Sequence, residues 1–270
     1  MTTAFLDRLA RLGRFFWSGW VGLAGISLFF AVWQYGHEAY GDFILPSPIA
    51  TLIATWHLLH SADTWRLVAA TSERAFQGFI LTALIGGLVG LAVGYSFAAM
   101  RLARPLLTII LGVPPIAWIV LAMIWFGSGR GTVLTTILVA AFPLVFANVA
   151  EAVATRDRSL EDMARAFGAG PMQRIWTIVM RQVAGHYFPS LAIALGTSFK
   201  VAVMAELLAN IEGIGLALAM SRANLDVAQS IAWVVLIVAA IIIVEYGLVH
   251  PVRAEFERWR EAARPWGIKR

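Results

Sequence analysis

Long apolar segments are the feature that most restricts what this chain of 270 residues can fold into. A helix needs about 20 mostly apolar residues to cross a bilayer. The chain is 60% hydrophobic and only 14% charged, more apolar surface than a soluble domain of this length can bury. We therefore predict an all-α membrane protein with six transmembrane helices, at residues 20–35, 76–98, 106–126, 131–153, 187–208 and 231–249.

The first 17 residues are predicted to form a separate amphipathic helix. Residues 5–16 place apolar and basic side chains on different helical faces, with Phe5, Leu9, Leu12 and Phe16 on one and Arg8, Arg11 and Arg14 on another. Such a helix is expected to lie on an anionic membrane surface. A cleaved signal peptide is disfavoured, because the basic region is long and no small-x-small cleavage site follows. Residues 18–270 are then expected to form a single transmembrane domain.

Lysine and arginine are distributed unevenly between the two ends of the predicted spans. Of the 21 basic residues, 16 lie on one side and 4 on the other, and Lys200 lies within a span. The side richer in Lys and Arg is expected to be cytoplasmic. This places both termini and the segment 157–182 in the cytoplasm, which agrees with six spans.

The segment 157–182 is amphipathic and contains two predicted short helices. In the first, Ser159 is expected to be the N-cap and Gly168 to end the helix. In the second, Pro171 suits the first turn. The apolar positions recur at helical spacing, with Leu160, Met163, Ala164 and Phe167 in the first helix and Met172, Ile175, Trp176 and Val179 in the second.

Prolines and glycines mark further local features. Pro114-Pro115 should break or kink the span 106–126, and we expect residues 113–118 to lie inside the helix bundle. Ser47-Pro48 should start a helix that runs to about Leu59. Glycines at four-residue spacing in the span 76–98 predict close packing of another helix, at Gly86, Gly90 and Gly94.

The segment 157–182 resembles the cytoplasmic coupling loop, or EAA loop, of permease subunits of bacterial ABC importers. Asp162-Met163-Ala164 stands at the Glu-Ala-Ala positions, Gly168 at the family glycine, and Arg181 where the family usually has proline. The stretch Pro114-Pro115-Ile116-Ala117-Trp118 is similar to a Pro-Pro-x-Ala-Trp element of the nitrate, sulfonate, taurine and bicarbonate group. Gly213-Ile214-Gly215 is similar to a Gly-x-Gly element that precedes a short external helix.

This resemblance implies a permease in the bacterial cytoplasmic (inner) membrane. Its partners would be a second copy of itself, two cytoplasmic ATP-binding subunits and an external solute-binding protein, with no nucleic acid. ATP and magnesium would be bound by the ATP-binding subunits, so no cofactor is expected on this chain. The residues expected to couple to those subunits are Leu160, Glu161, Asp162, Met163, Ala164, Phe167 and Gly168.

The expected solute path involves polar groups and the proline break. Lys200 is the basic residue inside a span, where an isolated charge costs about 2.5–3.5 kcal/mol on insertion scales. It could face an anionic solute, or it could be a structural charge paired to a neighbouring helix or subunit. The residues assigned to the path are Pro114, Pro115, Trp118, Ser198, Lys200 and Glu206, where Glu206 could equally serve packing or a gate.

A different class of function is a stand-alone, ion-coupled carrier or channel that uses Lys200, Glu206 and Glu245 as a relay. It is the weaker hypothesis, because the internal repeats typical of such carriers are not evident. No phosphate-binding loop, catalytic constellation or metal-ligand spacing appears in the sequence. We therefore expect neither an enzyme nor a metal site.

Overall fold

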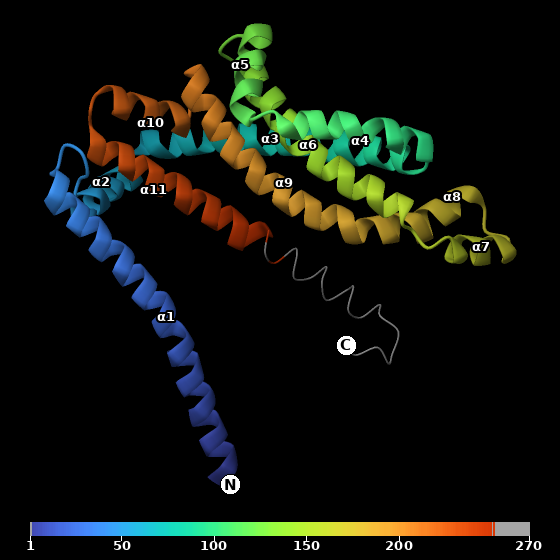
Figure 1. Cartoon of the computed structure of the whole chain (residues 1–270), viewed down its shortest axis with the longest axis horizontal. Helices are drawn as coiled ribbons and strands as arrows, with labels where there is room; N and C mark the ends of the chain where they lie inside the picture. The colour runs from blue at the N-terminus through green and yellow to red at the C-terminus, as the bar shows by residue number, and fades with distance from the viewer. Residues whose placement is uncertain (1, 250, 252–270) are drawn as a thin grey trace.

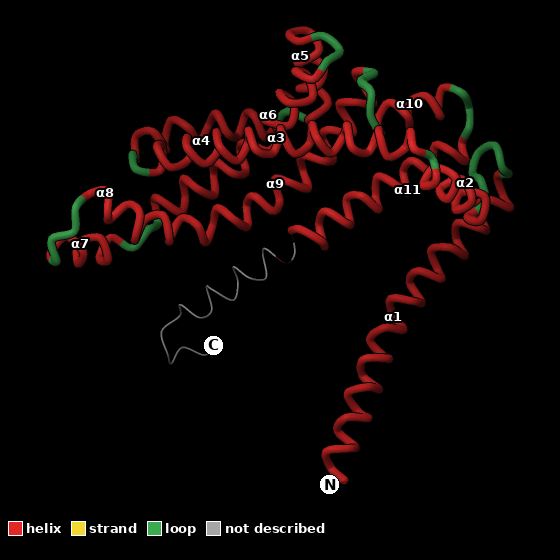
Figure 2. Tube along the Cα trace, turned by 180° about the vertical axis from the view of Figure 1, so that it is seen from behind, coloured by secondary structure: helices red, strands yellow, loops and turns green. Residues whose placement is uncertain are grey.

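The structure, a computed structural model, describes residues 2–249 and 251, and these residues form helices joined by short loops with no strand among them. The predicted all-α fold is confirmed. Figure 1 shows a group of long helices lying side by side, with the first helix projecting away from it. Figure 2 shows the same arrangement from behind and marks how short the connecting loops are.

Helix α1 (Thr2–Tyr40) is continuous, so no break in the backbone separates residues 5–16 from residues 20–35. The placement of residues 1–17 on the membrane surface stays a prediction. A short loop then leads to α2 (Pro48–His60), whose start is the predicted one. The Ser47 hydroxyl accepts a hydrogen bond from Ala50 N at 3.1 Å, and Pro48 occupies the first turn.

Helices α3 (Ala62–Gly94) and α6 (Arg130–Ala154) form the closest pair of the bundle, and α9 (Met180–Ala209) packs against both. The helix α3 begins 14 residues before the predicted span 76–98. Close packing at its glycines is confirmed: a Cβ added at Gly90 would lie 2.9 Å from Phe146 O, and one at Gly94 would lie 2.8 Å from Ala150 O. The backbones of α3 and α6 therefore approach where no side chain separates them.

The predicted break at Pro114-Pro115 is confirmed. Helix α4 (Phe97–Gly112) and helix α5 (Pro115–Phe126) are bent by 94° relative to each other, and α5 projects from the bundle (Figure 1). The expectation that residues 113–118 lie inside the bundle is met only in part in this single chain, where Val113, Ala117 and Trp118 are partly buried. Pro114, Pro115 and Ile116 are exposed at the bend, and the end of α5 projects from the packed helices (Figure 2).

The segment 157–182 contains one separate short helix, not two. Helix α7 (Arg158–Ala166) is isolated, whereas α8 (Pro171–Arg174) continues through a π-helical turn, η1 (Ile175–Val179), into α9. Together these last three elements make one helix of 39 residues, Pro171–Ala209. The predicted second helix is therefore the first turns of the fifth span, since nothing between Pro171 and Tyr187 interrupts helical backbone.

The chain ends, within the described residues, with α10 (Ile214–Ala223), α11 (Val227–Val244) and the π-helical turn η2 (Glu245–Val249). Among the described residues, four helices are long and apolar enough to cross a membrane, or five if the bent pair α4–α5 counts as one span. The predicted count of six is thus not confirmed. The charged tail after Pro251 lies outside the described residues.

Candidate functional site

The start of α7 is capped by Asp157, and the prediction that Ser159 is the N-cap is wrong. The Asp157 carboxylate accepts hydrogen bonds from the Ser159 hydroxyl at 2.7 Å and from Ser159 N at 2.9 Å. These bonds stabilise the ionised carboxylate and lower the pKa of Asp157 below its ordinary value. Ser159 thus serves as a donor to the cap.

The end of α7 is set by Gly168, as predicted. Gly168 has φ of +80°, a conformation that favours glycine. Gly168 N donates to Arg165 O at 3.0 Å, and Ala169 N donates to Ala164 O at 2.9 Å. These bonds occupy carbonyl groups that the helix end would otherwise leave free, so α7 stops sharply.

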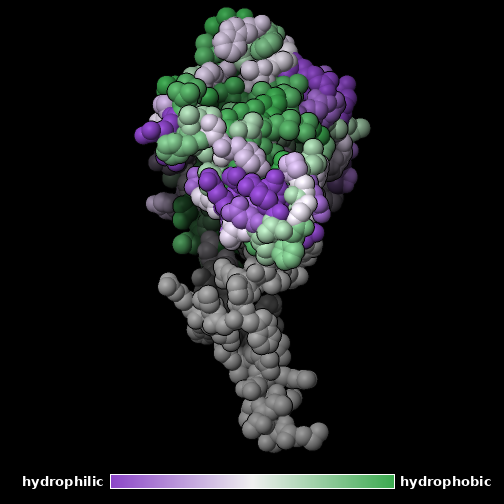
Figure 3. Space-filling model, turned by 90° about the vertical axis from the view of Figure 1, so that its right-hand side faces the viewer, coloured by the Kyte–Doolittle hydropathy of each residue, from purple (hydrophilic) through white to green (hydrophobic). Residues whose placement is uncertain are grey.

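The apolar face of α7 is exposed. The exposed fraction is 40% for Leu160, 53% for Met163 and 84% for Phe167, and no residue of α7 is buried. Figure 3 views this end of the molecule and shows a hydrophilic patch next to hydrophobic side chains. A short, capped helix with a bare apolar face has the form of one that docks into a groove of another protein.

Arg156, which is not among the predicted site residues, connects α7 to the bundle. Its guanidinium donates to Glu161 Oε1 at 2.6 Å and to Val153 O at 2.7 Å, and it lies 4.6 Å above the Tyr95 ring. A second tie runs from Asp157 N to Gln182 Oε1 at 2.8 Å. Helix α7 is therefore anchored to α6, to the end of α3 and to α9. Glu161, predicted to couple to a partner, uses its carboxylate within this chain.

Glu206 is fully buried, with a carboxylate that joins three helices. Oε2 accepts from the Thr71 hydroxyl at 2.8 Å and from Gly215 N at 3.3 Å, and Oε1 accepts from the Arg74 guanidinium. The Arg74 side chain is itself only 14% exposed. This arrangement favours the packing role considered for Glu206, because no oxygen of the carboxylate faces an open space.

Gly213 makes room for that carboxylate. A Cβ added at Gly213 would meet the Glu206 carboxylate, and one added at Gly215 would meet Val203 O and Leu207 N. The two glycines of the predicted Gly-Ile-Gly element are thus required for α10 to begin against α9. The same element places the N-terminus of α10 at a negative charge, because Gly215 N, which has no acceptor within its own helix, donates to the Glu206 carboxylate.

The other predicted path residues are not gathered at one place. Ser198 is fully buried and donates to Ala194 O at 2.7 Å within its own helix. Lys200 is exposed and has no hydrogen-bond or ion-pair partner among the described residues. The Trp118 indole Nε1 is buried and has no hydrogen-bond partner among the residues that the structure describes. Within the described residues, no three His, Asp or Glu side chains are grouped to hold a metal ion.

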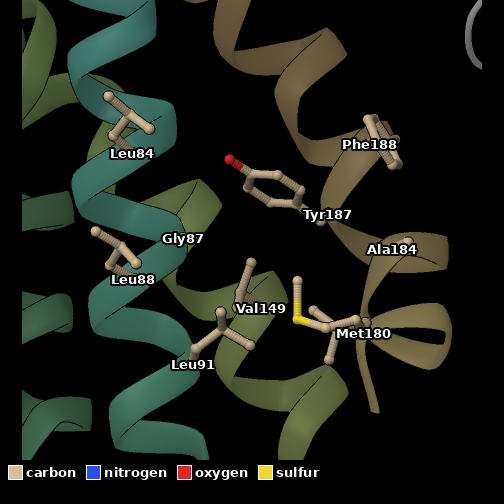
Figure 4. A pocket seen from close by; sticks show the side chains of 10 residues that line it. Leu84, Gly87, Leu88, Leu91, Val149, Met180, Ala184, Tyr187 and Phe188 are labelled. Atoms are coloured by element: carbon tan, nitrogen blue, oxygen red, sulfur yellow. The ribbon is translucent and has the colours of Figure 1, made fainter. Parts of the chain in front are cut away.

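A pocket of about 270 Å³ lies between α3, α6 and α9. Figure 4 shows Tyr187 pointing across it toward α3, where its hydroxyl donates to Ala83 O at 3.0 Å. The remaining lining is apolar, and none of the predicted path residues takes part in it. The pocket is therefore separate from the predicted solute path.

Comparison with known proteins finds similarity to membrane components of binding-protein-dependent transport systems. Residues 76–249 match the family model of the binding-protein-dependent transport system inner membrane component. The taurine transport system permease protein TauC of Escherichia coli K12 is 27% identical over 187 residues, which cover 69% of this chain and 68% of TauC. The bicarbonate transport system permease protein CmpB of Synechococcus elongatus is 27% identical over 206 residues, covering 72% and 73% of the two chains.

Similarity to solved structures concerns the fold. An inward-facing structure of the MetNI methionine ABC transporter matches with a TM-score of 0.54 at 16% sequence identity. The match covers 76% of this chain and all of the compared chain. Since the matched family model spans more than half of the sequence, this chain belongs to the binding-protein-dependent transport system inner membrane component family and is a multi-pass membrane permease subunit of an ABC importer.

Proposed function

We propose that this permease works as a homodimer that binds two cytoplasmic ATP-binding subunits through α7 and receives its solute from an external binding protein. The observation that carries the proposal is the exposed apolar face of α7, formed by Leu160, Met163 and Phe167. An unattached surface helix would be expected to bury such a face against its own protein or lipid. Here the face is turned outward on a helix whose N-terminal end is held by Arg156 and Asp157.

The ties of α7 provide a mechanical connection to the bundle. A movement of α7 acts on α6 through Arg156 and Val153, and on α9 through Asp157 and Gln182. Both α6 and α9 belong to the closely packed centre of the chain. Closure of the ATP-binding subunits would therefore tilt these helices as a unit and switch the permease between inward-open and outward-open states.

A second copy is supported by helices that this chain leaves uncovered. Helix α1 contacts only α2 appreciably among the described elements, and its apolar side chains are exposed, including Leu23, Leu28, Phe29 and Val32. Helix α5 likewise exposes Val120, Ile124 and Trp125. We propose that the second copy packs on these apolar faces and that lipid covers the side chains that it leaves exposed.

The solute is proposed to be a small anion. Relatives of this chain are named for taurine, aliphatic sulfonates, bicarbonate and nitrate, which all carry an anionic oxygen-rich group. In the proposed orientation, both termini and α7 are cytoplasmic. The relay of the stand-alone carrier hypothesis is not supported, because Glu206 is held in an ion pair with Arg74.

The coupling role is tested with Phe167→Ala in the complete complex. We expect ATP-driven uptake into proteoliposomes to fall at least about tenfold, because a buried aromatic anchor contributes 2 kcal/mol or more at an interface. The matched control is Phe43→Ala, an exposed phenylalanine (69%) in the loop before α2. Unchanged uptake in Phe167→Ala, or an equal loss in Phe43→Ala, would contradict the proposed role of α7.

A further inference from the structure

Lys200 is a positive charge for which the described part of the chain, residues 2–249 and 251, provides no counter-charge. Among the described residues, the nearest acidic group along α9 is Glu206, and its carboxylate is already held by Arg74, Thr71 and Gly215. Glu245 makes no ion pair with Lys200 within the described part of the chain. The ammonium group of Lys200 therefore needs water, an anion or a second chain.

The position of Lys200 in α9 is too far from the end of the helix for its ammonium group to reach the membrane surface. Lys200 lies nine residues before the end of α9 at Ala209, which corresponds to about 13 Å at 1.5 Å per residue. The hydrocarbon core is about 30 Å thick, so the predicted span 187–208 would place Lys200 well inside it. The lysine side chain is too short to bring its charge from that depth to the interface, so Lys200 must face a polar environment inside the membrane.

The exposed part of α9 around Lys200 is a narrow stripe. Ile193, Lys200 and Met204 are exposed, and their spacing of seven and then four residues places them on one face of the helix. Gly196 lies between them, and a Cβ added there would meet no atom within 4 Å. The residues on the other faces are packed into the protein, namely Ser198, Phe199, Val201 and Ala202.

We propose that this stripe, defined by Ile193, Gly196, Lys200 and Met204, lines a water-filled path and that the Lys200 ammonium binds the anionic group of the solute there. This inference rests on the proposed function and names the substrate class of its path. A lysine ammonium is a compact point charge without the fixed fork of a guanidinium. The site therefore selects for negative charge and places little demand on the shape of the anion, whether planar or tetrahedral.

The absence of cysteine from the chain allows a direct test of the electrostatic field at the stripe. Met204→Cys places one thiol a single helical turn from Lys200. The complex in proteoliposomes is treated with an anionic reagent, 2-sulfonatoethyl methanethiosulfonate, and with a cationic one, 2-(trimethylammonio)ethyl methanethiosulfonate. We expect both to react, because water reaches the stripe.

The charge of Lys200 is then removed with Lys200→Met in the same Met204→Cys background. The ratio of anionic to cationic reaction rates should fall by at least about fivefold, because one unit charge a few ångströms away changes each rate in opposite directions. Lys200→Arg should preserve the ratio. Leu88→Cys on α3 and Ile109→Cys on α4, exposed apolar positions away from the stripe, are the controls and should be insensitive to Lys200→Met.

Two results would overturn the inference: a Met204 thiol that reacts no faster than the controls, or a rate ratio that Lys200→Met leaves unchanged. Ile193→Cys serves as the second thiol on the same stripe if Met204→Cys does not assemble. Co-purification of ATP-binding subunits is measured in the same samples. If those subunits are present and the ratio is unchanged, the anion site fails alone; if they are absent, the proposed function fails.

Discussion

The Thr71 hydroxyl connects the Glu206 carboxylate to the first turn of α10. It donates to Glu206 Oε2 at 2.8 Å and accepts from Ile214 N at 3.0 Å. Through this one hydroxyl, α3, α9 and α10 meet at a buried ionic centre. A buried charge is tolerated only when its hydrogen-bonding capacity is satisfied, and here both carboxylate oxygens are occupied.

Breaking this centre should destabilise the permease. Glu206→Ala leaves the Arg74 guanidinium and Gly215 N without their acceptor, and removing one member of a buried pair costs about 3–5 kcal/mol. We expect the thermal unfolding midpoint of the purified protein to fall clearly. Replacing both residues, with Glu206→Gln and Arg74→Met, should be less harmful than Glu206→Ala. Full stability of Glu206→Ala would contradict the structural role.

Arg156 should be essential for coupling. Arg156→Gln removes the ion pair with Glu161 and the contact with the Tyr95 ring, and hydrogen bonds to charged groups contribute about 1.5–3 kcal/mol. We expect ATP-driven uptake to fall several-fold while the permease still assembles in the membrane. Arg158→Gln is the matched control, since Arg158 is exposed and forms no ion pair with the described residues. Equal effects of the two substitutions would argue against Arg156 as the connection.

The close packing at Gly94 predicts that adding one methyl group there lowers the stability of the protein. Gly94→Ala brings a Cβ within 2.8 Å of Ala150 O and 2.6 Å of Val153 Cβ, so α3 and α6 must separate. Overpacking of this kind costs about 1–3 kcal/mol. Gly196→Ala is the control, because a Cβ there meets no atom within 4 Å. Thermal unfolding of the two variants should differ, and equal stability would show that α3 and α6 can move apart freely.

The cap of α7 predicts a dependence on acidic pH. The pKa of Asp157 is lowered in the folded protein by the hydrogen bonds from Ser159. A carboxyl with a depressed pKa stabilises the folded state fully above its ordinary pKa of about 3.9 and loses this contribution as the pH falls toward the folded value. A spin label at Met163→Cys should therefore become more mobile below about pH 4.

The control for this titration is Asp157→Asn, which keeps a capping oxygen but cannot ionise. Its spin-label mobility should not change over the same pH range. If the variant and the parent protein show the same pH dependence, another group is responsible for the change at α7.

Local chemistry made several parts of the structure predictable. The break at Pro114-Pro115, the cap at Ser47, the stop at Gly168 and the close approach at Gly90 each follow from the conformational limits of proline, serine or glycine. The apolar periodicity of residues 160–167 likewise predicted a helix with a distinct apolar face. These features depend on neighbouring residues alone.

Features that depend on tertiary contacts were missed or wrong. Nothing next to Glu206 in sequence indicates Arg74, which lies 132 residues earlier and just outside the predicted span 76–98. Arg156 lies between the predicted span 131–153 and the segment 157–182, and its spacing of five from Glu161 across the start of a helix was the available signal. Asp157 and Ser159 are both good caps, and the backbone geometry of the loop selects Asp157.

The most direct test of the proposed function is the native mass of the complex extracted from its own membrane in mild detergent. We predict a particle of two copies of this chain and two ATP-binding subunits, and we expect Phe167→Ala to release those subunits. A monomer or a bare homodimer without ATP-binding subunits, found in several mild detergents, would contradict the proposal that α7 couples this permease to ATP hydrolysis.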